Sequence, residues 1–258
     1  MTEKKTTVLI TGASSGIGKS LAHLFAKDGA NIILAARSAE KMEEIKKELQ
    51  EKYHSTVFVY TCDLSNPKSA KELFQFTKEK NLVVDVLVNN AGFGNLGAFA
   101  ETPLQEEFDM IQLNITALTI LCKLFIKEMV QRNSGKILNV ASTAAFQPGP
   151  FMAVYFATKS YVLFLSEALA EELRGTNVHV SALCPGPTAT GFQERAFSKV
   201  QPTWRYMDVE TVAKVAYDGL KKNKTIIIPG FANKLMAFAI RLTPRQLAVK
   251  VLRSIVKK

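Results

Sequence analysis

The sequence of 258 residues predicts a single α/β domain, built on a doubly wound parallel sheet of about seven strands with helices on both faces. Short apolar runs alternate with segments of helical periodicity along the chain, a pattern typical of parallel strand pairing. Most of these runs lack polar alternation, as strands do when helices cover both faces of a sheet. Because 47% of the residues are apolar, one domain of this length can bury a sizeable core.

The strands are expected where β-branched and apolar residues run together. The first ends in glycine, and the later ones follow helical segments at regular intervals. No internal repeat, low-complexity tract or linker divides the chain, so residues 1–258 are expected to form one Rossmann-type domain. The predicted strands cover 6–12, 31–37, 56–63, 84–92, 135–142, 178–186 and 225–230.

The helices between them carry recognisable end signals. Gly29 is expected to end the first helix, and Ser38 to cap the second. Thr102 and Pro103 resemble a capping box with proline in the first turn, opening a helical region that runs to about residue 131. The predicted helices cover 14–29, 38–53, 68–80, 102–131 and 152–173, with another before the seventh strand.

Several classes of protein are disfavoured by composition. The charged N-terminus lacks a signal-peptide pattern, and no apolar run reaches the roughly 18 residues of a membrane span. Cys62, Cys122 and Cys184 are scattered and odd in number, which favours reduced thiols over a disulfide framework. The three histidines show no metal-ligand spacing, so no metal is expected. We expect a cytoplasmic protein, with peripheral membrane association left open.

The net charge of +10 is concentrated at the C-terminus. The last 40 residues contain ten of the 33 basic side chains and none of the 23 acidic ones, so the preceding 218 residues sum to zero. Residues 231–258 are expected to form a basic helical extension. It could contact an anionic membrane or an acidic partner, or it could pack on the domain or another subunit. No nucleic-acid reading motif accompanies the charge.

A glycine cluster separates the first strand from the first helix. In TGASSGIG, Gly12, Gly16 and Gly18 allow a sharp turn and a close approach to a pyrophosphate at a helix N-terminus. Sites for NAD usually carry an acidic residue about 20 positions later, but here Ala36 and Arg37 follow the second strand. A guanidinium at that place can bind a 2′-phosphate, so NADP(H) is predicted over NAD(H).

Further motifs follow in a fixed order: CDLS, NNAG, an asparagine in a long helix, a serine after the fifth strand, Y-x-x-x-K and PGPTAT. In this order the chain resembles the classical short-chain dehydrogenases/reductases from about residue 5 to residue 230. The resemblance implies an NADP-dependent oxidoreductase acting on a carbonyl or secondary alcohol. It also implies a homodimer or homotetramer, which slightly favours packing or subunit contact over membrane contact for the C-terminal extension.

The resemblance assigns four catalytic residues. Tyr155 matches the proton donor or acceptor, and Lys159 matches its partner. Ser142 matches the residue that binds the substrate carbonyl, and Asn114 the asparagine that holds a water in a proton relay. For the cofactor it implies contacts from Gly12, Ser14, Ser15, Gly16, Ile17, Gly18, Arg37, Asp63, Leu64, Asn90, Ala91, Gly92, Tyr155, Lys159, Pro185, Gly186, Thr188 and Thr190.

The spacing of Tyr155 and Lys159 also predicts, independently of the resemblance, an effect of the lysine on the ionisation of the tyrosine. A lysine one helical turn beyond a tyrosine favours the phenolate, so the pKa of Tyr155 is expected to fall below its ordinary value of about 10. Charge on the substrate oxygen would then be balanced by Tyr155 and Ser142 while hydride moves.

The substrate is expected to be hydrophobic, because large apolar residues flank the motifs. Residues 188–207 carry few structural signals and are predicted to form a substrate lid. A 3-oxoacyl thioester reductase and a non-catalytic NADP(H)-binding sensor or scaffold remain alternatives. The apolar candidates are Phe93, Phe99, Phe146, Phe151, Met152, Phe192, Phe197, Trp204 and Met207.

Overall fold

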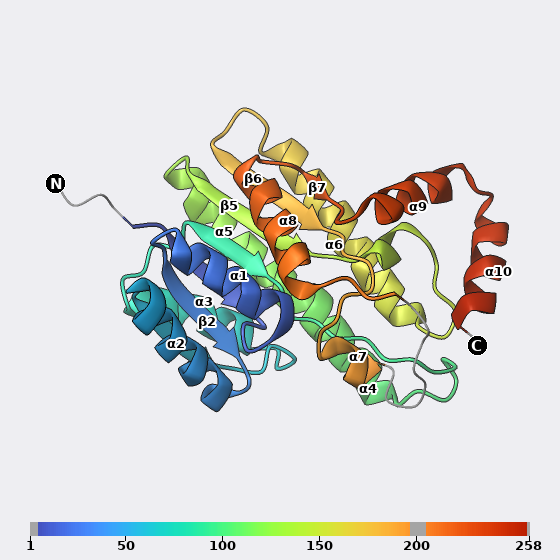
Figure 1. The fold of residues 1–258 in the computed structure, drawn as a ribbon, viewed down its shortest axis with the longest axis horizontal. Coiled ribbons are helices and arrows are strands. Elements are labelled where there is room, and N and C mark those ends of the chain that lie inside the picture. Colours follow the sequence, from blue (N-terminus) through green and yellow to red (C-terminus); the bar gives the residue numbers. More distant parts are fainter. Residues whose placement is uncertain (1–4, 197–204, 257–258) are drawn as a thin grey trace.

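The computed structural model describes residues 5–196 and 205–256 and confirms the predicted sheet (Figure 1). All strands are parallel, in the order β3-β2-β1-β4-β5-β6-β7. The order reverses between β1 and β4, so a crevice is expected beyond the carboxyl ends of these two strands. The strands are Thr7–Thr11 (β1), Asn31–Ala36 (β2), Val57–Thr61 (β3), Val86–Asn89 (β4), Gly135–Val140 (β5), Val178–Leu183 (β6) and Ile226–Ile227 (β7).

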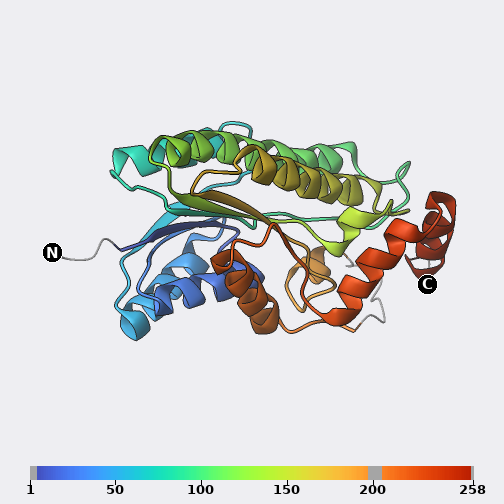
Figure 2. The ribbon, with the colours of Figure 1, turned by 90° about the horizontal axis from the view of Figure 1, so that it is seen from above.

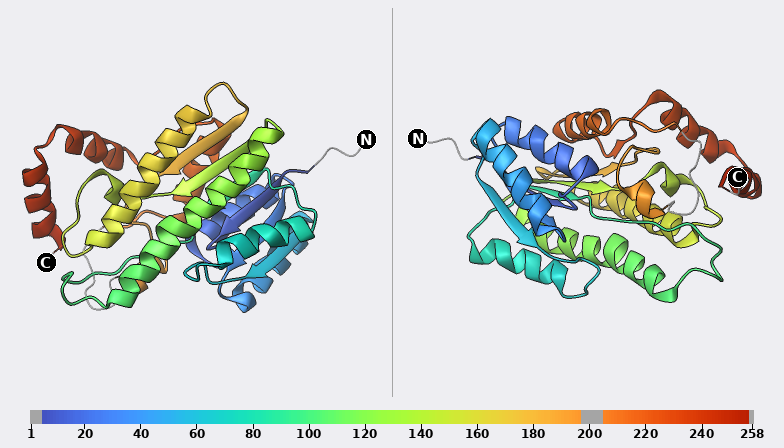
Figure 3. Two further views of the ribbon diagram at one scale, coloured as in Figure 1. Left: turned by 180° about the vertical axis from the view of Figure 1, so that it is seen from behind. Right: turned by 60° about the horizontal axis from the view of Figure 1, so that its bottom comes forward.

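Helices cover both faces of the sheet (Figure 2). On one face lie α1 (Gly16–Lys27), α2 (Ala39–Tyr53) and α8 (Val209–Lys221). On the other lie α3 (Ser69–Glu79), α5 (Leu118–Gln131) and α6 (Ala153–Glu172), of which α5 and α6 run side by side in Figure 3. Each layer has its own apolar core against the sheet. The central strands β1, β2, β4, β5 and β6 are therefore largely buried on both faces, as their unbroken apolar runs predicted, whereas the edge strand β3 is only half-buried.

The predicted helix ends are partly confirmed. Gly29 follows α1 with a φ of 82°, which a glycine adopts without strain. The Ser38 hydroxyl accepts the backbone N–H of Lys41 at the start of α2. The capping box at residues 102–105 was wrong: α4 (Leu104–Ile111) has Pro103 in the capping position, and the Thr102 hydroxyl bonds the carbonyl of Phe99 instead.

The long helical region expected up to residue 131 is continuous but not uniform. A π-helical stretch, Gln112–Ala117, separates α4 from α5. The run Leu104–Gln131 is long and apolar enough to cross a membrane by length and composition. However, one side of the run packs within the domain, where Leu121 and Phe125 are buried in the core against the sheet.

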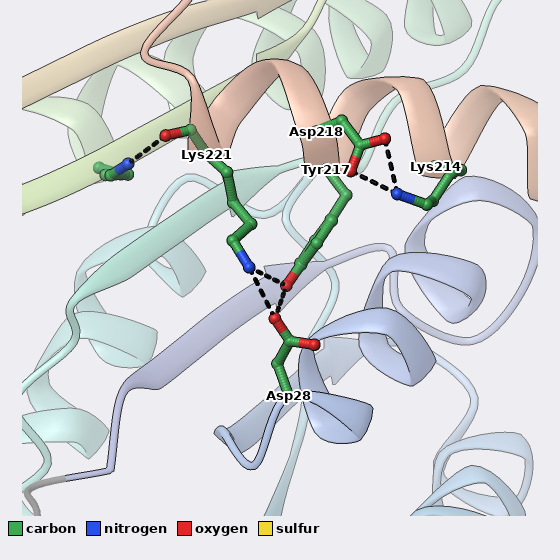
Figure 4. A network of polar contacts seen from close by, with 6 residues as sticks. Asp28, Lys214, Tyr217, Asp218 and Lys221 are labelled. Atoms are coloured by element: carbon green, nitrogen blue, oxygen red, sulfur yellow. Dashed lines mark hydrogen bonds and ion pairs between the residues drawn. The ribbon is translucent and has the colours of Figure 1, made fainter.

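One polar network ties two helices of the same layer (Figure 4). Asp28, which ends α1, accepts hydrogen bonds from the Tyr217 hydroxyl and, at 2.9 Å, from the Lys221 ammonium, both on α8. These bonds lower the pKa of Asp28 and raise the pKa of Lys221. Lys214 and Asp218 form a separate ion pair within α8. The first network therefore fixes α8 against α1, whereas the second is local.

Beyond β7 the chain forms two helices that project from the end of the molecule opposite the N-terminus (Figures 1 and 2). They are α9 (Phe231–Leu242) and α10 (Arg245–Val256). The start of α9 is anchored through Asn233, whose amide donates to the carbonyl of Pro229 at 2.8 Å. The helical extension predicted from the sequence is thus present. The predicted lid contains a short helix, α7 (Phe192–Ala196), and residues 197–204 lie outside the described part.

Candidate active site

The glycine loop between β1 and α1 leaves the helix N-terminus without a side-chain cap. Gly12 and Gly16 have φ values of 63° and 53°, in the left-handed region that favours glycine. The hydroxyl of Ser15, at the capping position of α1, accepts no capping bond. The first backbone N–H groups of a helix have no partner within it, so those of Gly16 and Ile17 can receive a phosphate. Ser14 lies half-buried in the same turn.

Close packing holds this loop against the carboxyl end of β4. The side-chain amide of Asn90 donates to the carbonyls of Thr11 at 2.9 Å and Gly12 at 3.1 Å. A methyl group added at Gly18 would lie 2.6 Å from that amide nitrogen and from the Gly12 oxygen. The Thr11 hydroxyl in turn accepts the backbone N–H groups of Asn90 and Ala91, each at 3.0 Å. Asn90 therefore joins the glycine loop to the carboxyl end of β4, and its predicted contact with the cofactor stays a prediction.

The residues expected around the adenosine half follow β2 and β3. Arg37 is exposed directly after β2, and no carboxylate of the described residues pairs with it. Asp63 is exposed after β3, where its carboxylate accepts the backbone N–H and hydroxyl of Ser65 at 2.9 and 2.7 Å. Leu64 is buried in the core. Their contacts with a nucleotide stay predictions.

Asn114 lies in the π-helical stretch between α4 and α5. π-Helical turns inside α-helices frequently occur at functional sites. Its side-chain oxygen accepts the N–H of Phe93 at 3.2 Å, and its amide donates to the carbonyl of Phe93 at 2.9 Å and the Thr158 hydroxyl at 3.0 Å. A methyl group added at Gly92 would lie 3.0 Å from this oxygen and 3.2 Å from Lys159 Nζ. Asn114 thus joins the loop after β4 to the helix bearing Tyr155, while its expected role in a water relay is untested.

Tyr155 is buried at the N-terminal end of α6, and the Ser142 side chain lies close enough to offer a hydrogen bond to its phenolate. Burial raises the pKa of Tyr155 to about 12, although the Ser142 side chain opposes this. The sequence-based expectation of a lowered pKa was therefore wrong for the protein without its cofactor. The reason is that desolvation by burial penalises the phenolate more than the Ser142 side chain favours it.

Lys159 lies one turn further along α6 and is also buried. Its ammonium lies 5.9 Å from the centroid of the Tyr155 ring and donates to the carbonyl of Val140 at 2.8 Å. Burial lowers the pKa of Lys159 to about 8. The two side chains are within reach of each other, yet a backbone carbonyl rather than the phenol oxygen accepts the hydrogen bond of the lysine.

The PGPTAT segment after β6 closes the site from the other side. The carbonyl of Pro185 accepts the Ser142 hydroxyl at 3.4 Å and the N–H of Thr143 at 2.9 Å. Gly186 and Thr188 are buried, and the Thr188 hydroxyl donates to the Gly186 carbonyl at 2.8 Å. A methyl group added at Gly16 would lie 3.0 Å from the Thr190 side chain, so this segment reaches the glycine loop.

A separate apolar cluster surrounds Tyr155. Phe192 of α7 lies 5.2 Å from it, ring centroid to ring centroid. Of the predicted apolar candidates, Phe93 and Met152 also belong to this cluster. Phe146 packs in the sheet core instead, Met207 packs on the opposite layer, and Phe99 is 67% exposed. Phe151 is half-buried; Phe197 and Trp204 lie outside the described residues. The cluster members are Phe93, Met110, Ala144, Met152, Tyr155, Phe156 and Ala196.

Sequence reasoning missed three residues of this site. Thr11 organises the glycine loop, and Thr158 binds Asn114. Gly94 lies so close to the catalytic candidate that an added methyl group would be 2.7 Å from a Tyr155 ring carbon. Thr158 directly precedes Lys159 in the sequence, which was the available signal. For Thr11 and Gly94 the reason is a tertiary contact that no local pattern encodes.

The arrangement fits a nicotinamide dinucleotide. An uncapped helix N-terminus and left-handed glycines lie beyond the carboxyl end of β1, and Ser142, Tyr155 and Lys159 lie beyond the carboxyl end of β5. Across the described residues, no group of three or more histidine, cysteine, aspartate or glutamate side chains could hold a metal ion. When bound, the nicotinamide ring supplies or accepts a hydride.

Comparisons with known proteins agree with this geometry. The chain is 37% identical over 187 residues to an uncharacterized oxidoreductase, YvrD, of Bacillus subtilis, covering 72% of this chain and 70% of YvrD. It resembles a short-chain dehydrogenase from Sphingobium yanoikuyae in complex with NADPH, with a TM-score of 0.83, 32% identity and 91% and 92% of the two chains covered. A bulky-bulky ketone specific alcohol dehydrogenase from Comamonas testosteroni has a TM-score of 0.80 and 32% identity, with 93% and 94% covered.

A family model described as short chain dehydrogenase matches residues 6–201, which is most of the chain. Together with the parallel sheet and the relatives above, this match establishes that the chain belongs to the short-chain dehydrogenase/reductase family of oxidoreductases.

Proposed function

We propose that this protein reduces the carbonyl group of a hydrophobic ketone with NADPH, and oxidises the corresponding secondary alcohol in reverse. One observation carries the proposal: the Tyr155 hydroxyl is buried beside the Ser142 side chain and surrounded by an apolar cluster. A substrate carbonyl oxygen placed between these two side chains could accept a hydrogen bond from each hydroxyl. The groups attached to the carbonyl carbon would then pack on Phe93, Met152 and Phe192.

The raised pKa of Tyr155 suits it as a proton donor. With a pKa of about 12 the phenol is protonated across the physiological range, so it can transfer a proton to the substrate oxygen as the carbon is reduced. Ser142 hydrogen-bonds the same oxygen as negative charge builds on it. The Lys159 cation nearby stabilises the phenolate that remains, and Val140 holds the ammonium in place.

The preference for NADPH rests on Arg37. An exposed guanidinium at the end of β2, with no carboxylate partner among the described residues, can bind a 2′-phosphate by charge-assisted hydrogen bonds. The Sphingobium relative in complex with NADPH supports this assignment. The hydrophobic substrate is supported by the apolar cluster and by the bulky-bulky ketone specificity named for the Comamonas relative.

The test is a panel of ketones and aldehydes of increasing apolar size, followed by NADPH absorbance, with NADH in parallel. We expect turnover that rises with the apolar size of the ketone. Tyr155→Phe keeps the ring but removes the acid, so it should lower kcat by about 100- to 10,000-fold while NADPH still binds. Tyr161→Phe serves as a matched control, because it removes the hydroxyl of an exposed tyrosine on the same helix that contacts Thr119 outside the site.

The same panel discriminates the alternatives. Turnover confined to 3-oxoacyl thioesters would indicate a reductase of carrier-bound acyl chains. NADPH binding without turnover of any carbonyl, unchanged by Tyr155→Phe, would indicate a sensor or scaffold. The buried Tyr155 hydroxyl beside Ser142 favours catalysis, because nucleotide binding alone needs no proton donor beside the nicotinamide.

We also propose that the chain forms a homodimer or homotetramer and is cytoplasmic. Large apolar side chains are exposed on α4 and α6: Leu104 is 68%, Phe108 55% and Phe164 63% exposed. Such a surface supports pairing with another copy. Sedimentation equilibrium with Phe108→Ser and Phe164→Ser tests it, since a monomer in both the wild type and the variants would contradict the proposal.

A further inference from the structure

The outer side of α9 is apolar. Ala237, which is 4% exposed, lies on the inner side of α9, where the helix packs on the domain. Four large side chains, spaced four, three and four residues apart, share the opposite side. A helix that packs on its domain normally turns its apolar stripe inward, so this stripe has no partner within the described chain. Its members and exposed fractions are Phe231 80%, Leu235 57%, Phe238 61% and Leu242 73%.

The neighbouring α10 divides its apolar residues between two sides. Ala248 is buried and Leu252 packs against the cluster around Tyr155. Leu247 and Val251, which are 52% and 51% exposed, point away from that contact. We call the exposed set the C-terminal apolar face; it consists of Phe231, Leu235, Phe238, Leu242, Leu247 and Val251. The two helices that carry it project together from one end of the domain (Figures 1 and 3).

Only cations accompany this face. Lys234 and Arg241 are exposed on α9, and Arg245, Lys250 and Arg253 are exposed on α10. No carboxylate of residues 5–196 or 205–256 forms an ion pair with any of them. The last 40 residues of the chain contain no aspartate or glutamate at all. The surface therefore combines uncovered apolar side chains with uncompensated positive charge.

We propose that α9 and α10 bind the surface of an anionic lipid membrane, with the C-terminal apolar face entering the interface and the cations contacting lipid phosphates. Amphipathic helices with basic residues bind such surfaces by these two contributions together. A second copy of the same face fits less well, because two all-basic surfaces would repel each other when brought into contact. Neutral lipid would satisfy the apolar face but not the charge.

Membrane binding through these helices has a consequence for access to the active site. This consequence rests on the proposed function. The inner side of α10 contacts the apolar cluster around Tyr155, while its outer side would face the lipid. One helix would then connect the membrane with the wall of the substrate site. An apolar ketone dissolved in the bilayer could reach Tyr155 without crossing water.

Binding is tested by flotation of the full chain with phosphatidylcholine vesicles, with and without about 30% phosphatidylglycerol. We expect flotation with the anionic vesicles, and its loss when salt is raised from about 0.1 M to about 0.5 M. Phe231→Ser/Phe238→Ser should abolish flotation, whereas Val83→Ser/Val130→Ser removes exposed aliphatic side chains elsewhere and should not.

The charges are tested separately. Lys234→Gln/Arg241→Gln should weaken binding about 25-fold, since each cation near an anionic surface contributes about 1 kcal/mol, or roughly five-fold. Lys41→Gln/Lys47→Gln removes two exposed lysines of α2 and should leave vesicle affinity unchanged.

Two results would overturn the proposal: no flotation with anionic vesicles, or flotation that the α9 variants do not reduce. If the α9 variants instead abolish self-association or binding of an acidic acyl carrier protein, the face belongs to a protein interface and the lipid proposal fails. Turnover of a water-soluble ketone with NADPH is measured in the same samples. Its absence in every sample contradicts the proposed function, but leaves the vesicle result standing by itself.

Discussion

The ammonium of Lys159 lies 5.9 Å from the ring centroid of Tyr155 and donates its hydrogen bond to the carbonyl of Val140. The lysine is therefore held beside the phenol by the end of β5 rather than by the phenol oxygen. Burial dominates both groups, raising the pKa of Tyr155 to about 12 and lowering the pKa of Lys159 to about 8. Both shifts favour the neutral forms, as desolvation requires.

This pair predicts the pH dependence of reduction. Tyr155 stays protonated to well above neutral pH, whereas Lys159 loses its charge as pH rises through about 8. A charged lysine makes the phenol a stronger acid, so kcat/KM for ketone reduction should be highest below about pH 8 and fall above it.

The measurement is the rate of NADPH oxidation from about pH 6 to about pH 10. Lys159→Arg keeps its charge throughout this range and should remove the decline, at a lower overall rate. A wild-type profile that stays level across the range would contradict the assignment of the decline to Lys159.

Arg37 predicts a change of cofactor preference. Arg37→Ala removes the guanidinium after β2, and a charge-assisted hydrogen bond contributes about 1.5–3 kcal/mol. The KM for NADPH should rise about 10- to 100-fold, while the KM for NADH stays the same because NADH has no 2′-phosphate. Arg174→Ala, at an exposed arginine beyond α6, is the control. Equal effects on both cofactors would refute a phosphate contact.

The close packing of Gly94 against Tyr155 predicts that a larger residue at position 94 lowers kcat. An added methyl group would lie 2.7 Å from one Tyr155 ring carbon and 3.1 Å from a Phe192 ring carbon, so Gly94→Ala must displace the ring. We expect kcat to fall at least ten-fold, with the dissociation constant of NADPH nearly unchanged.

Gly191→Ala is the matched control, because a methyl group there meets nothing within 4 Å. Stopped-flow reduction and NADPH fluorescence titration separate the two quantities. If both variants turned over at the wild-type rate, the Tyr155 ring would not be constrained by Gly94.

The Asp28 network predicts a pH-dependent stability (Figure 4). The hydrogen bonds from Tyr217 and Lys221 lower the pKa of Asp28 below its ordinary 3.8, so the ionised carboxylate stabilises the fold above that value. This contribution disappears as pH falls through the lowered pKa. Asp28→Asn should reduce the free energy of unfolding by about 0.5–1 kcal/mol at neutral pH, a modest amount because the network is largely exposed.

Urea unfolding of wild type and variant gives this difference, which should shrink as pH is lowered toward about 3. Asp218→Asn breaks only a pair within α8, and should cost about 0.3–0.5 kcal/mol. A difference for Asp28→Asn that persists unchanged in acid would show that its effect does not come from the carboxylate charge.

The sequence by itself determined the sheet, the helix order and the family. These depend on local patterns: strands buried on both faces read as unbroken apolar runs, and the glycine loop, Asn114, Ser142, Tyr155 and Lys159 occur in a fixed order. Helix ends were predicted where one cap decides them, as at Ser38. The prediction was wrong at Thr102, because its hydroxyl donates to the carbonyl of Phe99 rather than capping α4.

Only the tertiary structure decided the electrostatics of the site and the surface of the C-terminal helices. The direction of the Tyr155 pKa depends on how much of the surrounding chain excludes water, which no spacing of two residues encodes. The contact of Gly94 with Tyr155 arises from packing between distant segments, and the π-helical turn at Asn114 was found only in the structure. The sequence predicted a basic helical extension over residues 231–258, but only the fold directed Phe231 and Phe238 away from the core, because the opposite side of α9 packs on the domain.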